Sequence, residues 1–84
     1  MSGAVPRYAP AILAALAGHG LAPRADTAPQ ALRDAINDLY RYEIRRLRDR
    51  CRAGEFPSSA LAGHVVQLRR RYVLLSIPLE RWTI

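Results

Sequence analysis

At 84 residues, half of them hydrophobic, the chain is long enough for one small domain of modest stability and too short for two. A charged fraction of 24% is ordinary for a globular protein, so the composition excludes a largely disordered chain. The net charge is +6, and all thirteen basic residues are arginine. The fourteen alanines also use GC-rich codons, so the arginine count reflects a GC-rich, bacterial coding sequence as well as chemistry.

The single cysteine, Cys51, excludes an intramolecular disulfide and a cysteine-based metal cluster, and it fits a reducing compartment. The longest apolar run, residues 9–17, is too short for a bilayer span, which needs about 20 residues. This run is rich in alanine and is closed by His19, which disfavours a secretory signal. We therefore expect a cytoplasmic protein without a membrane span.

The first predicted helix is short and follows a flexible lead-in at residues 1–8. It covers residues 10–18, because Pro10 suits an opening turn and a glycine at 18 or 20 can adopt the left-handed conformation that ends a helix. So short a helix needs tertiary contacts to persist.

The second predicted helix is long and covers residues 28–52. Thr27 and Gln30 fit a capping box at its start, and Gly54 closes it. Spacings of three and four place its apolar residues on one stripe. These residues are Leu32, Ile36, Leu39, Tyr40, Ile44, Leu47 and Cys51.

The third predicted helix covers residues 58–72, with Ser58 or Ser59 as its cap. Its apolar residues alternate steps of four and three, which suits packing against a longer helix. They are Leu61, Val65, Leu68, Tyr72 and Leu75. Gly63 inside this helix costs roughly 1 kcal/mol relative to alanine, which favours a close approach of another backbone there.

The last segment, residues 73–84, is predicted as an apolar, partly extended tail that folds back on the helices through Trp82. The elements together predict one all-α domain over residues 1–84. Its fold is a small three-helix bundle, in which a short helix lies across an antiparallel pair formed by the long helix and the third helix.

Arginine is concentrated in residues 41–71, where nine arginines and three acids give the whole net charge of +6. In an antiparallel hairpin Arg69–Arg71 would lie near Arg41 and Glu43, so the basic surface would be a stripe along the hairpin. Such a stripe suits a polyanion, although a solvated helix face is the plainer interpretation. The candidate polyanion-binding residues are Arg41, Arg45, Arg48, Arg52, Arg69 and Arg70.

The tail holds more large apolar side chains than a small bundle is expected to bury. A surplus would form a protein interface, for which Leu74, Leu79 and Trp82 are the candidates, with Trp82 as anchor. The alternative is a tail used entirely in the intramolecular core.

Catalytic and metal-binding groups are poorly represented. Cys51 lies on the apolar stripe, and neither His19 nor His64 stands at a recognised ligand spacing from it. Asp34 and Asp38 are one turn apart, but acids near a helix start are favoured for structural reasons. No catalytic residue, metal ligand or cofactor is predicted, and the chain is not expected to be an enzyme.

The sequence predicts a non-enzymatic helical interaction module that binds another protein or itself, through the tail and the exposed face of the hairpin. The alternative is a small nucleic-acid-binding protein that uses its arginine-rich face. A membrane-surface role is disfavoured, because packing within the bundle accounts for the apolar stripe. No small-molecule substrate is expected, and the sequence identifies neither the partner nor the oligomeric state.

Overall fold

The protein is all-α in the computed structural model, which describes residues 7–84. It has three α-helices: α1 (Pro10–Gly18), α2 (Pro29–Arg52) and α3 (Leu61–Arg71). The described residues contain no strand, and one isolated bridge joins Tyr8 to Thr83. The predicted three-helix bundle is confirmed. Most of the expected lead-in, residues 1–8, lies outside the described residues.

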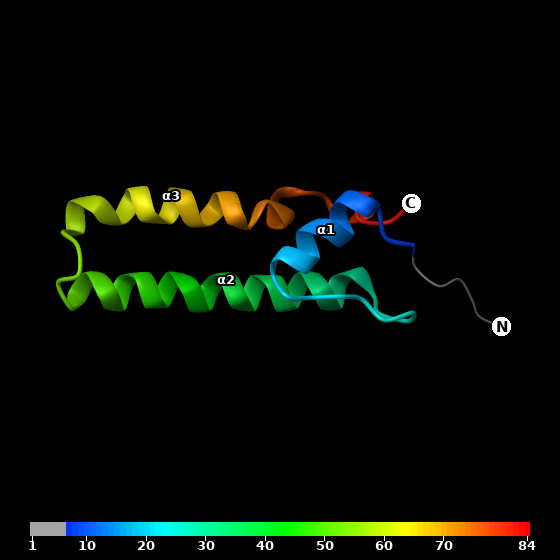
Figure 1. Ribbon diagram of the computed structural model, residues 1–84, viewed down its shortest axis with the longest axis horizontal. Helices are drawn as coiled ribbons and strands as arrows, with labels where there is room; N and C mark the ends of the chain where they lie inside the picture. The colour runs from blue at the N-terminus through cyan, green and yellow to red at the C-terminus, as the bar shows by residue number, and fades with distance from the viewer. Residues whose placement is uncertain (1–6) are drawn as a thin grey trace.

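The bundle is a rod, because α2 lies antiparallel to α3 and to the tail that continues from α3, while α1 crosses only one end (Figure 1). Its extents are 56 × 17 × 17 Å, and its radius of gyration of 15.8 Å exceeds the roughly 12 Å of a compact chain this long. We call the end with α1 the core end and the other end, where α2 turns into α3, the turn end.

Two of the three helices, α1 and α2, begin with proline. Pro10 and Pro29 occupy the first helical turn, where the missing N–H costs no hydrogen bond. The capping box predicted at α2 is wrong, since Ala28 is the cap and no side chain bonds the helix start. Thr27 instead accepts a hydrogen bond at 2.8 Å from the backbone N–H of Arg24, which closes the turn before the helix.

The turn between α2 and α3 depends on Gly54, whose φ of 82° is the left-handed conformation expected of a helix-ending glycine. A single 3₁₀ turn, η1 (Ser58–Ala60), leads into α3. The predicted serine cap is wrong, because neither serine side chain bonds the start of this turn or of α3. The predicted close approach at Gly63 is also wrong: a Cβ built there would meet nothing within 4 Å.

The tail is more helical than predicted, with two 3₁₀ turns, η2 (Val73–Ser76) and η3 (Leu79–Arg81). It folds back as expected and places Trp82 in one hydrophobic cluster with residues of α1 and α2. The indole N–H of Trp82 donates to the backbone carbonyl of Ile77 at 3.2 Å, and its own carbonyl accepts from the N–H of Ala9 at 2.9 Å. The first bond lies within the tail, and the second fastens the tail to the segment that enters α1.

The hydrophobic core gathers at the core end. Its buried residues come from α1 and the residue that leads into it, from the first half of α2, from the end of α3 and from the tail: Tyr8, Ile12, Leu16, Leu32, Ile36, Leu68, Tyr72, Leu74 and Trp82.

The interface predicted for the tail is corrected by this core. Leu74 and Trp82 have no exposed surface, and Leu79 is half-buried against them, so none of the three is an exposed anchor. The physical reason is that α1 covers only the core end of the hairpin, and the tail fills the remaining space there.

Candidate protein-interaction groove

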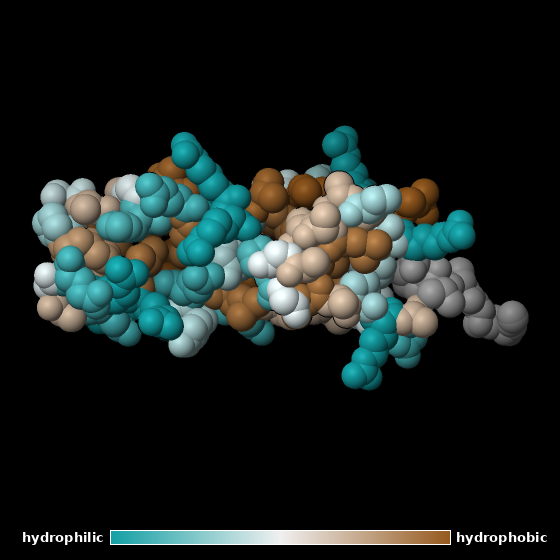
Figure 2. All heavy atoms as spheres, viewed as in Figure 1, coloured by the Kyte–Doolittle hydropathy of each residue, from teal (hydrophilic) through white to brown (hydrophobic). Residues whose placement is uncertain are grey.

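The positive charge and the hydrophobic core are concentrated in different parts of the rod. The segment 41–71, which we call the basic hairpin, carries nine arginines, three acids and the whole net charge of +6. Among its side chains only Leu68 is buried. Figure 2 shows the consequence: hydrophilic side chains predominate over the turn end, with apolar ones visible between them, and apolar side chains are more extensive over the core end. The basic hairpin is therefore a two-helix arm whose apolar residues are covered incompletely.

A groove runs along this arm between α2 and α3, with a volume of about 750 Å³. Leucine side chains and one tyrosine form its apolar surface: Leu39, Tyr42, Leu47 and Leu68. Arginines from both helices stand around them: Arg46, Arg50, Arg70 and Arg71. Leu39 and Tyr42 are 38% and 54% exposed, so solvent reaches a substantial part of the apolar surface.

The arginines of the groove differ in how far they are already neutralised. Arg71 pairs with Glu43 at 3.3 Å, and Arg50 pairs with Glu55 at 3.1 Å. Within residues 7–84 neither Arg46 nor Arg70 forms an ion pair. Positive charge in the groove thus exceeds what its own acids neutralise.

Aromatic contacts fix the positions of two of these arginines. The Arg46 guanidinium lies 6.0 Å from the centroid of the Tyr42 ring, and that of Arg50 lies 5.7 Å from the centroid of Phe56. Arginine over an aromatic face is stabilised by the ring quadrupole. The Phe56 ring in turn packs on His64 with centroids 4.2 Å apart, and His64 lines the groove.

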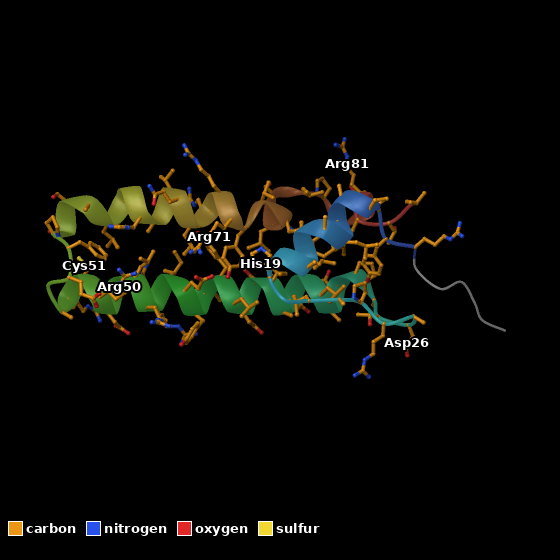
Figure 3. The ribbon with its side chains drawn as sticks, viewed as in Figure 1. His19, Asp26, Arg50, Cys51, Arg71 and Arg81 are labelled. Atoms are coloured by element: carbon orange, nitrogen blue, oxygen red, sulfur yellow. The ribbon has the colours of Figure 1, made fainter. Side chains whose placement is uncertain are left out.

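The other end of the groove stops at α1. His19, the residue after α1, stacks on Tyr72 with ring centroids 4.5 Å apart, and Figure 3 shows it beside Arg71 in the middle of the rod. Leu39, Glu43 and Arg71 line both this junction and the groove. The groove therefore begins where α1 ends and continues along the hairpin toward the turn.

The junction also holds a perturbed tyrosine. Tyr72 donates a hydrogen bond to the Glu43 carboxylate. Burial raises the pKa of Tyr72 to about 12, helped by this hydrogen bond and by the negative charge of Glu43, against the opposing charge of Arg71. Burial also raises the pKa of Tyr8. Glu43 is thus engaged by two partners of its own chain.

The structure brings most of the predicted polyanion-binding residues to the other flank of the hairpin. Arg41, Arg45 and Arg48 line a shallow hollow on α2 together with Tyr40. Arg69 and Arg70 line a second hollow, which also includes Tyr40, so the two hollows adjoin. Arg52 lies apart from both, at the end of α2, where it pairs with Asp49 at 3.9 Å.

Sequence reasoning missed the groove itself. Leu39, Tyr42, Arg46 and Arg50 follow one another at spacings of three and four, so they share one flank of α2. That signal was present in the sequence, but only the fold reveals that α1 leaves this flank uncovered.

The remaining candidates stay apart. Cys51 is half-buried near the turn, and Figure 3 shows it far along the rod from His19. Asp34 accepts a hydrogen bond at 2.9 Å from the side chain of Gln30, in keeping with a structural role. In the part of the chain that the structure describes, no three potential metal ligands gather.

Comparisons of the chain with protein-family models, curated proteins and solved structures find no match. Within residues 7–84, no helix combines the length and the apolar character that crossing a membrane requires.

Proposed function

We propose that the protein is a non-enzymatic interaction module that binds another protein through the groove of its basic hairpin. One observation carries the proposal: over the basic hairpin only Leu68 is buried, while the exposed side chains of Leu39 and Tyr42 lie between arginines from two helices. Apolar surface surrounded by polar residues is typical of a protein interface, and tyrosine and arginine are the residues enriched there. The single free thiol, that of the half-buried Cys51, is compatible with a cytoplasmic location.

The burial of the tail changes where the partner is expected. Because Trp82 and Leu74 belong to the core, a partner cannot reach them without unfolding the tail. The hairpin is the remaining part of the predicted interaction surface.

A nucleic acid is the second candidate, and a separate observation favours it. Arg41, Arg45 and Arg48 share one hollow on the other flank, and within residues 7–84 none of them forms an ion pair. Unpaired arginines at such spacing suit phosphates, whose neutralisation releases counterions. The groove also holds arginines, but they lie beside leucines that offer phosphates no hydrogen bond.

The proposal is tested by affinity purification from the source cells with three forms of the full chain. The groove variant combines Leu39→Ser with Arg46→Ser. The control combines Leu13→Ser with Arg81→Ser, since Leu13 is 41% exposed, much like Leu39, and both control residues lie at the core end. Circular dichroism first establishes that all three forms fold.

We expect a protein that is recovered with the wild type and with the control but lost with the groove variant. Recovery of the same proteins by all three forms would contradict the proposal. Recovery of nucleic acid that depends on Arg41, Arg45 and Arg48 would transfer the function to the second candidate.

A further inference from the structure

The arrangement of α1 against the hairpin points to the chemistry of the partner, an inference that rests on the proposed function. We propose that the groove receives an acidic amphipathic helix of the partner protein, which lies along α2 and α3 and completes a three-helix bundle at the turn end.

The first argument is the length of α1. With nine residues α1 extends about 13 Å, whereas the 24 residues of α2 extend about 36 Å. The chain then leaves the hairpin at Gly20, where φ is 76°. A third helix therefore packs on the core end only, and at the turn end the position of a third helix beside α2 and α3 is open.

The second argument is the shape and length of the groove. From Leu39 to Arg50 it follows α2 for about 17 Å, which equals three turns of a docked helix. A helix binds such a groove through apolar side chains spaced three and four residues apart. Leu39, Tyr42 and Leu47 supply the accessible apolar surface, above the buried Leu68.

The third argument is charge, which selects among the occupants. The groove has four arginines and a single carboxylate, Glu43, which Tyr72 and Arg71 already engage. A second copy of this chain would bring another hairpin of charge +6 against it, and like charges facing each other across an interface disfavour binding. Acidic residues on the flanks of a docked helix would instead meet Arg46 and Arg70, which have no acid partner within residues 7–84.

Nucleic acid fits this groove less well than an acidic helix. Phosphates would face Leu39 and Leu47, which offer them no hydrogen bond, and these leucines would gain no apolar contact in return. An acidic amphipathic helix satisfies both parts of the surface at once.

The test is a fluorescence-anisotropy titration of the full chain with three labelled peptides of about 18 residues, a length at which isolated helices begin to form. The first has an apolar stripe flanked by glutamates, and the second has the same stripe flanked by lysines. The third is a scramble of the first, with the same charge but no stripe. A single-stranded oligonucleotide serves as a competitor, and each titration is repeated near 0.15 M salt.

We expect the acidic amphipathic peptide to bind at least about tenfold more tightly than either other peptide. Leu39→Ser and Arg46→Ser should each weaken it by about tenfold, while Leu13→Ser and Arg81→Ser should leave it unchanged. Equal binding of the acidic peptide and its scramble would overturn the inference, as would no binding, or binding that ignores the groove variants. Displacement of the acidic peptide by stoichiometric amounts of the oligonucleotide would also overturn the inference.

The two proposals fail in different ways. If a cellular partner depends on the groove but the acidic peptide does not bind, the interaction module stands and the acidic helix is wrong. If no cellular protein depends on the groove, the proposed function is wrong whatever the peptides do.

Discussion

The hydroxyl of Tyr72, at the end of α3, donates a hydrogen bond to the carboxylate of Glu43 in the middle of α2. The same tyrosine ring contacts His19 after α1 and Tyr40 in α2, with centroids 4.5 and 5.2 Å apart. One side chain thus joins all three helices at the boundary between the core and the basic hairpin. The interaction also predicts how stability depends on alkaline pH.

Stability should fall as the pH rises from about 10 to about 12. Tyr72 has a pKa of about 12 in the folded chain, raised from the ordinary 10.0 of an unfolded tyrosine. Below pH 10 both states keep the proton, so the stabilisation is complete. Above pH 10 the unfolded chain ionises first, and roughly 2 kcal/mol of stability is lost by the time the pH reaches the pKa of folded Tyr72. Denaturant unfolding at a series of pH values measures this loss.

Tyr72→Phe is the control for that titration, because the other tyrosines and the arginines remain. The stability difference between wild type and variant should be constant below pH 10 and shrink above it. Glu43→Gln should lower the pKa of Tyr72 only in part, since burial is the larger cause. A difference that stays constant to pH 12 would show that the tyrosine is not perturbed.

Trp82→Ala should cost about 3–5 kcal/mol and leave so small a domain mostly unfolded, because it empties a fully buried site and removes the bond to Ile77. Trp82→Phe should cost less. Ile84→Ala, at a side chain that is 84% exposed, should change stability by no more than about 0.5 kcal/mol. Thermal unfolding followed by circular dichroism measures all three, and equal melting temperatures would mean that the tail is not part of the core.

The tail shows what sequence could and could not predict. Apolar periodicity and the glycines predict the three helices and their antiparallel order, and with them the proximity of Arg71 and Glu43. Hydropathy marks Trp82 as apolar but does not say whether a cavity in the bundle accommodates it. That depends on how much of the hairpin the nine residues of α1 cover, which is a property of three-dimensional packing. The groove could not be predicted from the sequence either, because it also depends on how much of the hairpin α1 covers.

Replacing Gly63 or Gly54 with alanine should change the stability of the protein in opposite directions. A Cβ at Gly63 would meet nothing within 4 Å, and the residue lies inside α3, so Gly63→Ala should stabilise the protein by about 1 kcal/mol. Gly54 has φ of 82°, where an L side chain is strained, so Gly54→Ala should destabilise it by about 1 kcal/mol. Chemical denaturation compares the pair. Destabilisation by Gly63→Ala would indicate that a backbone or partner approaches there after all.

Hydrogen exchange should be graded along α2. Amides in residues 32–40, beside the core, should exchange at least about tenfold more slowly than those in residues 44–51, where no side chain is buried. The helix is continuous, so the gradient would come from packing and not from secondary structure. Uniform protection along α2 would mean that the turn end is stable by itself and needs no third helix. A bound acidic helix should raise protection in residues 44–51 and leave residues 32–36 unchanged, because the groove that it occupies begins at Leu39.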